Sequence, residues 1–256
     1  MRLKVDFHTH TSDDLVEVKV SGRNNLPSPY ELIDLAVAKN FDAIAITHHG
    51  IIYRNPKVEA YARKKGLLLL SGAEAFIERK HVVLINYPML KPFKTYEDLC
   101  RHKREDGLII APHPYYVLGK CVGKNLEKYP QCFDAVEYSR FHYKWINPAE
   151  KARRVAEKLN LPVVGCSDAH EKYQFGNTYS IVDAEKKSVE SIIRAVKAGK
   201  VEYVSENETL INFIRDLWWT LKTFPLEFYH LSRRISAAFF SFFVNQIRNL
   251  KEKINQ

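Results

Sequence analysis

Histidine and carboxylate side chains recur along this 256-residue chain where short apolar runs begin or end. Imidazole nitrogens and carboxylate oxygens are ligands that transition metals take in proteins. Because parallel strands of a barrel deliver their ends to one mouth, we expect these side chains to converge on a multinuclear metal site. The candidate ligands are His8, His10, Asp14 with Asp13 as its alternative, His49, Glu74, His81, His113, Asp168 and His170.

Two motifs place a pair of candidate ligands two residues apart. His8 and His10 lie in Asp6-Phe7-His8-Thr9-His10, and Asp168 and His170 lie in Ser167-Asp168-Ala169-His170. Alternate residues of a strand project to the same face, so each pair can hold one ion. A single His-x-His pair is a weak signal, because a polar strand end produces it by chance. The prediction therefore depends on the other strand ends as well.

Four further candidate ligands occur singly and not in pairs. His49 follows the run Ile44–Thr47, Glu74 follows Ser71-Gly72-Ala73, and two prolines flank His113. His81 instead opens a run. The two oxygens of a carboxylate can serve different ions, so Glu74 is the candidate bridge between metals.

Short apolar runs that alternate with amphipathic stretches must position these residues. This alternation predicts an α/β protein with a parallel sheet. Seven or eight such units favour a closed or nearly closed barrel over a doubly wound open sheet. Helix starts are predicted at Ser28-Pro29, Asn55-Pro56 and Asn147-Pro148. The apolar runs are Leu3–Phe7, Ala43–Thr47, Leu67–Ser71, Val82–Ile85, Leu108–Ala111, Ala135–Tyr138, Pro162–Cys166 and Tyr179–Val182.

In their order along the chain, these motifs resemble the PHP (polymerase and histidinol phosphatase) family of metal-dependent phosphoesterases. The matching elements are D-F-H-T-H-T, A-I-T-x-H, G-x-E followed by H-V-V-L-I, A-P-H-P and S-D-A-H. The resemblance implies a distorted (β/α)7 TIM-like barrel, which we expect over residues 1–205. It also implies two to three divalent metal ions, commonly manganese, zinc or iron.

The resemblance further implies how the ligands are shared. His8, His10, Glu74 and Asp168 would hold the first ion, and Glu74, His81 and His113 the second. His49 and His170 would hold the third with Asp14 or Asp13. Two departures affect this third site: His48 stands where the family usually has Asp, and no glycine follows the Asp13-Asp14 pair.

The implied activity is hydrolysis of a small phosphate ester or a nucleotide-type phosphodiester by a hydroxide that bridges two ions. Arg140 follows a strand end and is the candidate phosphate clamp, because a planar guanidinium suits phosphate; a surface arginine is the competing interpretation. His142 and Tyr115 are further candidates at that end. The alternatives are a non-catalytic PHP-like barrel that binds nucleic acid as a subunit, and an amidohydrolase barrel. A candidate at every ligand position favours the enzyme.

Composition sets the class of partners. A formal net charge of +9 favours anionic partners, which include a phosphorylated substrate, nucleic acid or a membrane surface. No apolar run approaches the roughly 20 residues that cross a bilayer, and no signal peptide is recognisable. The four cysteines show no C-x-x-C pairing, so we expect reduced thiols in a cytoplasmic protein.

The pattern changes after residue 205. Apolar residues spaced by three or four, such as Phe228, Leu231 and Ile235, predict an amphipathic helical extension over residues 206–256. We expect it to pack on the barrel or to join a second copy of the chain in a homo-oligomer. A basic helix that rests on a membrane surface is the alternative.

Overall fold

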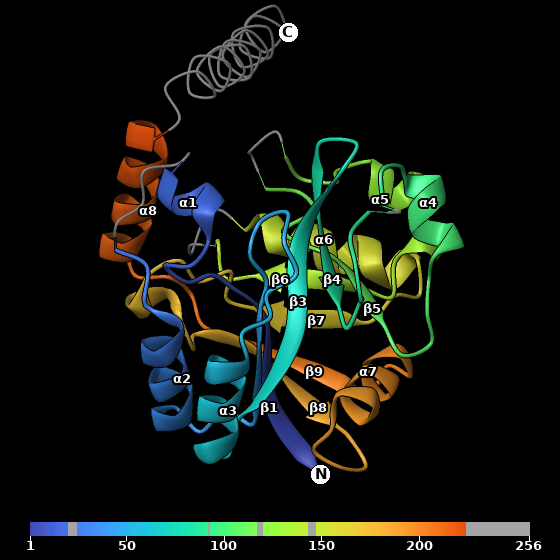
Figure 1. Cartoon of the computed structure of the whole chain (residues 1–256). Coiled ribbons are helices and arrows are strands. Elements are labelled where there is room, and N and C mark those ends of the chain that lie inside the picture. Colours follow the sequence, from blue (N-terminus) through green and yellow to red (C-terminus); the bar gives the residue numbers. More distant parts are fainter. Residues whose placement is uncertain (20–24, 92, 117–119, 143–146, 224–256) are drawn as a thin grey trace, which may run out of the picture.

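The computed structural model describes residues 1–19, 25–91, 93–116, 120–142 and 147–223. Within these ranges, nine strands form one sheet in the order β7-β6-β5-β4-β3-β2-β1-β8-β9 (Figure 1). The strands are β1 (Arg2–Thr9), β2 (Ala43–Ile46), β3 (Leu68–Ile77), β4 (Lys80–Ile85), β5 (Leu108–Ala111), β6 (Ala135–Ser139), β7 (Val163–Cys166), β8 (Thr178–Asp183) and β9 (Val201–Ser205).

Helices follow most of these strands. They are α1 (Leu15–Lys19), α2 (Pro29–Ala38), α3 (Pro56–Lys64), α4 (Tyr96–Arg101), α5 (Asn125–Lys128), α6 (Pro148–Lys158), α7 (Val189–Lys197) and α8 (Leu210–Thr223), with short 3₁₀ turns η1 (Pro130–Cys132) and η2 (Lys172–Gln174). The three predicted helix starts are confirmed, because Ser28, Asn55 and Asn147 each accept a hydrogen bond from the first turn of their helix.

The sheet curls into a nearly closed barrel, as predicted. β1, β2 and β3 are mutually parallel, and so are β5, β6 and β7. The hydroxyl of Ser180 on β8 donates to the carbonyl of Gly165 on β7 at 3.0 Å, so the first and last parts of the sheet order lie against each other. The predicted parallel pairing is present in these two sets of strands, whereas β4, β8 and β9 pair in the antiparallel sense.

The β3–β4 hairpin explains the first of these exceptions. Ile77 pairs with Lys80, and the two turn residues Glu78 and Arg79 have φ values of 47° and 66°. Two left-handed residues in a two-residue loop match the twist of a tight hairpin. As a result the start of β4 lies at the same end of the barrel as the far end of β3, which brings His81 opposite Phe76.

Apolar side chains fill the barrel and its helical cover. Leu3, Val5 and Phe7 of β1 belong to a buried cluster that Ile192 and Val196 of α7 also join. A second buried cluster lies between the sheet and helices α2 and α3, and a third between the sheet and helices α4 and α6. This packing fixes the positions of the strands that carry the candidate ligands at or near their ends.

Two cysteines depart from the sequence-based prediction. Cys100 on α4 and Cys132 in η1 form a disulfide with their Cα atoms 4.3 Å apart, whereas Cys121 and Cys166 are free and buried. The prediction that all four thiols are reduced is therefore wrong in this structure. The cause is tertiary, because the two residues are 32 positions apart and meet only when α4 packs on η1.

The C-terminal extension is described as far as α8, which lies at the edge of the molecule (Figure 1). The part of the predicted extension from residue 224 to residue 256 lies outside the described residues. Among the described helices, none has the length and apolar character required to cross a membrane.

Candidate metal centre

Four donor atoms from three strands converge at one end of the barrel. His8 Nε2 and His10 Nε2 lie 3.1 Å apart, and each lies 3.3 Å from Asp168 Oδ1. Glu74 Oε2 lies 3.5 Å from His8 Nε2 and 3.6 Å from His10 Nε2. Ligands about 2.05 Å from a tetrahedral zinc ion stand about 3.3 Å from one another. These five separations are close to the spacing of donors around a single metal ion.

Two carboxylates behind the histidines fix the orientation of their rings. His8 Nδ1 lies 2.8 Å from Glu137 Oε2, and His10 Nδ1 lies 2.9 Å from Asp14 Oδ2. An imidazole that donates from Nδ1 to a carboxylate presents the lone pair of Nε2. In the neutral rings, two lone pairs therefore face each other across 3.1 Å, and a cation between them would relieve this repulsion.

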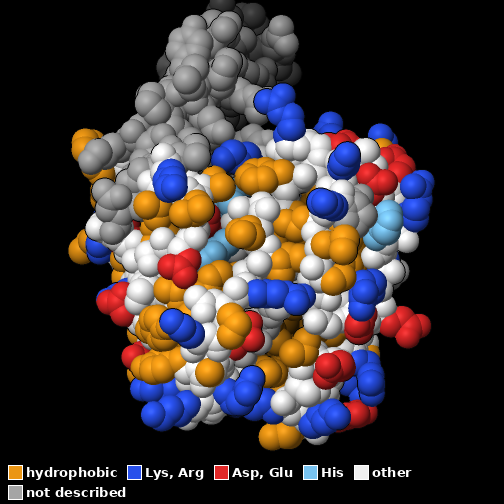
Figure 2. Space-filling model, in the orientation of Figure 1, with side chains coloured by type: hydrophobic (Ala, Val, Ile, Leu, Met, Phe, Trp, Pro, Cys, Tyr) orange, Lys and Arg blue, Asp and Glu red, His pale blue; other side chains and the backbone are white. Residues whose placement is uncertain are grey.

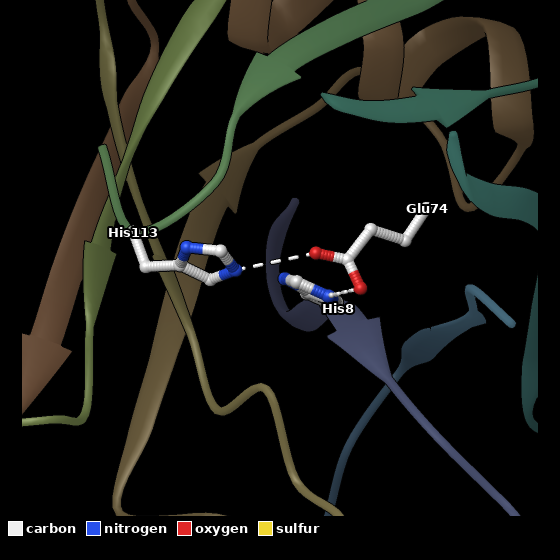
Figure 3. A group of neighbouring side chains, drawn as sticks. All are labelled: His8, Glu74 and His113. Atoms are coloured by element: carbon white, nitrogen blue, oxygen red, sulfur yellow. Dashed lines mark hydrogen bonds and ion pairs between the residues drawn. The ribbon is translucent and has the colours of Figure 1, made fainter. Parts of the chain in front are cut away.

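The second oxygen of Glu74 reaches two further histidines. Glu74 Oε1 lies 2.5 Å from His81 Nδ1 and 3.2 Å from His113 Nε2. Figure 3 shows one oxygen of the Glu74 carboxylate facing His113 and the other facing His8. His113 Nδ1 in turn lies 3.4 Å from the Cys121 sulfur. The two oxygens of Glu74 thus face different groups of histidines, which is the arrangement of a bridging ligand.

A third group surrounds His49. His49 Nε2 lies 2.8 Å from Glu74 Oε2, while its Nδ1 lies 2.9 Å from Asp14 Oδ2 and 3.8 Å from Glu17 Oε1. The other oxygen of Glu17 lies 3.6 Å from His170 Nε2. Asp14 is occupied by His10 and His49, so Glu17 is the carboxylate placed between His49 and His170.

Asp13 and His48 lie outside the cluster. The Asp13 side chain is exposed and accepts a hydrogen bond from the Tyr53 hydroxyl at 3.0 Å. His48 is buried, with Nε2 2.8 Å from the Thr11 hydroxyl, and burial lowers its pKa to about 3. The structure therefore brings Asp14 to the cluster and leaves Asp13 on the surface.

Strand direction explains why these residues meet. β1, β2 and β3 run in parallel, so His8 and His10, His49, and Glu74 are delivered to one end; an isolated bridge pairs His49 with Glu74. His81 arrives there because β4 runs the opposite way. The amide of Ser167 donates to Asp6 at 3.2 Å, which ties the loop after β7 to β1.

Two candidate ligands have unusual backbone conformations. His113 has a φ of 28° and Asp168 a φ of 45°. A residue with a side chain is strained in the left-handed region, at a cost of order 1–3 kcal/mol, and such residues cluster at functional sites. The loops after β5 and β7 are thus held in conformations that aim these side chains at the barrel mouth.

The electrostatic environment of the cluster favours positive charge. Burial alone would lower the pKa of His8, but Asp168, Glu74 and Glu137 raise it well above its ordinary value. Burial also lowers the pKa of His49, yet Glu74 and other carboxylates raise it to about 10. Burial opposes the ionised form of Glu74, but the surrounding histidines hold its pKa well below the usual range. Metal ions displace such protons when they bind.

The residues fit a metal by their unsatisfied atoms as well as by their chemistry. Asp168 Oδ1 and His81 Nε2 are buried without a hydrogen-bond partner among the described residues. Buried polar atoms normally find partners, and an absent cation accounts for these. The described residues contain three overlapping groups with donor atoms within 4.8 Å of one another: His8–Glu74–His113, His8–His10–Asp168 and His10–His49–Glu74.

The candidate phosphate-binding residues make hydrogen bonds of their own. Arg140 is 1 % exposed, and its Nη1 lies 2.9 Å from both Glu208 and Asp216. His142 Nδ1 donates to the backbone carbonyl of Ser139 at 3.2 Å. The Tyr115 hydroxyl donates to Glu127 at 2.8 Å. None of these contacts involves a candidate metal ligand, and two carboxylates neutralise the Arg140 guanidinium.

Sequence reasoning missed three residues that contact the candidate ligands: Glu17, Cys121 and Glu137. Glu137 interrupts the apolar run of β6 and is 0 % exposed, so a carboxylate within a buried strand was a usable signal. Glu17 lies in the five-residue helix α1, where a single acidic residue gives no comparable signal. Cys121 lies in a loop and has no motif.

Comparisons with known proteins agree with this architecture. Residues 148–201 match a family described as PHP-associated. An uncharacterized protein of Methanocaldococcus jannaschii is 24% identical over 128 residues, which cover 48% of this chain and 75% of that protein.

Solved structures show the same fold. A two-domain protein from Bacteroides vulgatus that contains a predicted PHP-like metal-dependent phosphoesterase superposes with a TM-score of 0.61 at 19% identity, covering 87% of this chain and 70% of that one. PsfC from Pseudomonas syringae gives 0.59 at 17% identity, covering 88% and 99%. The lesion-specific endonuclease EndoQ from Pyrococcus furiosus gives 0.55 at 16% identity, covering 85% and 66%. The predicted resemblance to the PHP family is confirmed.

Proposed function

We propose that the chain is a metal-dependent phosphoesterase that hydrolyses a small phosphate ester or a nucleotide-type phosphodiester. The observation that carries the proposal is the convergence of His8 Nε2, His10 Nε2, Asp168 Oδ1 and Glu74 Oε2 at separations of 3.1 to 3.6 Å. The PHP-type fold supports it, since structures with this fold include a predicted phosphoesterase and an endonuclease.

Three groups of residues would hold the ions. His8, His10, Glu74 and Asp168 form the first group, and Glu74, His81 and His113 form the second. His49 and His170 form the third with Asp14, as the resemblance implies, and with Glu17, which lies 3.8 Å from His49 Nδ1 and 3.6 Å from His170 Nε2. Divalent manganese, zinc or iron would act there as a Lewis acid toward phosphoryl oxygens and would lower the pKa of water.

The residues of the chain itself prepare this chemistry. Glu137 and Asp14 hold the imidazoles of His8 and His10 in the tautomer that offers Nε2 inward. The ligands are buried, so charges at the mouth interact more strongly than they would in water. We assign Arg140 to the attachment of α8, and not to phosphate binding, because Glu208 and Asp216 already occupy its guanidinium.

The test combines metal analysis with a substrate panel. The purified full chain is analysed for bound metal by mass spectrometry, then assayed with a chromogenic phosphomonoester and a chromogenic phosphodiester, each with added manganese or zinc. We expect two to three ions per chain and hydrolysis that a chelator removes and manganese restores. Bound metal without turnover of either ester would contradict the proposal. Nucleic-acid binding without bound metal would favour the non-catalytic barrel instead.

A further inference from the structure

One face of α8 is apolar and is not covered by the residues that the structure describes. Of the large apolar side chains of this helix, Leu210, Ile211, Ile214, Leu217 and Trp218 are all 45 to 70 % exposed. Successive residues of an α-helix turn by about 100°, so these five side chains fall within an arc of about 120°. We call them the α8 stripe. Hydrophobic side chains appear along the edge of the molecule in Figure 2, where Figure 1 places α8.

Buried polar contacts hold the opposite face of α8 to the barrel. Asp216 Oδ2 lies 2.9 Å from Arg140 Nη1, and Asp216 Oδ1 accepts hydrogen bonds from the Tyr173 hydroxyl and from Gln174 Nε2, both at 2.7 Å. Asp216 lies about 200° around the helix from the centre of the stripe. Rolling α8 to bury the stripe would pull Asp216 away from the buried Arg140 guanidinium. The stripe is thus fixed facing outward.

The chain continues from α8 into a segment of matching chemistry. Residues 235–247 contain no charged residue and include four phenylalanines. Arg233 and Arg234 precede this stretch, and Arg248, Lys251 and Lys253 follow it. From residue 211 to the end, seven Lys and Arg stand against three Asp and Glu, a net charge of +4. Aromatic residues between basic ones are typical of segments that bind membrane surfaces.

We propose that the α8 stripe docks the protein on an anionic lipid surface. Trp218, 68 % exposed at the end of the stripe, suits the boundary between headgroups and acyl chains. The basic residues that follow would add attraction to anionic headgroups. A second copy of the chain fits less well, because specific protein interfaces use about 20–30 residues a side and the stripe offers five. The contact between Arg140 and Asp216 would then fix the orientation of the metal centre relative to the membrane.

The test is sedimentation of the full chain with lipid vesicles. One set contains phosphatidylcholine alone and the other phosphatidylcholine mixed with phosphatidylglycerol. We expect the protein to partition at least about fivefold more strongly to the anionic vesicles, and added salt to weaken the binding. The double variant Ile214→Glu/Trp218→Glu should lower partitioning by about tenfold or more, because it places charge on the exposed face that would enter the lipid.

A matched control separates docking from general surface change. Met89→Glu alters another exposed apolar residue, 55 % exposed, and should leave partitioning unchanged. Circular dichroism melts establish that each variant is folded, and light scattering reports the mass of the free protein. Equal partitioning of the double variant and the parent would overturn the proposal. So would a dimer in solution that the double variant abolishes, because the stripe would then bind a second copy.

Discussion

Two buried clusters of charged groups lie in this molecule and differ in how they are balanced. Around Arg140, one guanidinium contacts the carboxylates of Glu208 and Asp216, so the cluster contains its own cation. Around Glu74, carboxylates and imidazoles face inward, and Asp168 Oδ1 has no hydrogen-bond partner within the described part of the chain. The first cluster has a permanent cation, although Arg140 Nε has no hydrogen-bond partner among the described residues, whereas the second has inward-facing carboxylates and imidazoles that a bound cation would suit.

The Arg140 cluster is thus suited to attach α8 to the barrel, and the Glu74 cluster is suited to bind metal. A guanidinium with five fixed donors holds two carboxylates at a permanent distance and so attaches α8 to the barrel. Imidazoles that offer lone pairs can instead bind and release a metal ion. Mutations should therefore change stability at the Arg140 cluster and metal content at the Glu74 cluster.

The largest effect should come from Glu74→Ala. Both oxygens of Glu74 face histidines, so its loss removes a ligand from more than one ion. We expect hydrolysis to fall by on the order of a thousandfold or more and bound metal to fall toward one ion or none. Mass spectrometry of the protein and initial rates measure these outcomes. Glu105→Ala, at an exposed glutamate, is the control; full metal and activity in Glu74→Ala would refute a bridging role.

Arg140→Ala should act on stability alone. The substitution leaves Glu208 and Asp216 without their cation in a buried site, which costs about 3–5 kcal/mol. Urea unfolding at saturating manganese measures the loss, and metal content should not change. Arg140→Lys should recover part of the lost stability, since the lysine ammonium restores the positive charge but not the planar set of guanidinium donors. Unchanged stability with a raised KM would instead return Arg140 to the role of a phosphate clamp.

Glu137→Gln should weaken metal binding without abolishing it. The amide keeps the volume of the side chain but accepts less strongly from His8 Nδ1. Loss of such an orienting partner typically costs 10- to 100-fold in metal affinity, and we expect about tenfold here. Competition with a chromophoric chelator measures the affinity. An unchanged affinity would mean that packing alone orients the His8 ring.

The smallest effects distinguish the carboxylates of the third group. Glu17→Gln should lower occupancy of the most weakly held ion, because Glu17 lies between His49 and His170. Asp13→Asn should leave metal content unchanged and alter stability by no more than about 0.5 kcal/mol, since Asp13 is exposed. Titration of the third ion compares the two variants. A larger effect from Asp13→Asn would restore the sequence-based alternative.

The sequence predicted the strands well because apolar runs end sharply at polar residues. His49, Glu74 and His113 each follow such a run or lie at its end, and the structure places all three in one cluster. Which carboxylate stands behind which imidazole was not predictable, because Glu137 meets His8 across 129 residues. The same holds for Arg140, whose partners lie 68 and 76 residues further on.

The contact between Asp6 and Ser167 joins residues that are 161 positions apart, beside ligands from the first and seventh strands. While the ribosome is still making the middle of the protein, His8 and His10 can offer a passing ion only two nitrogens. Tight capture has to wait until Asp168 has been synthesised and β7 has joined the barrel. The full set of donors therefore exists only after the β7 segment has been made and folded.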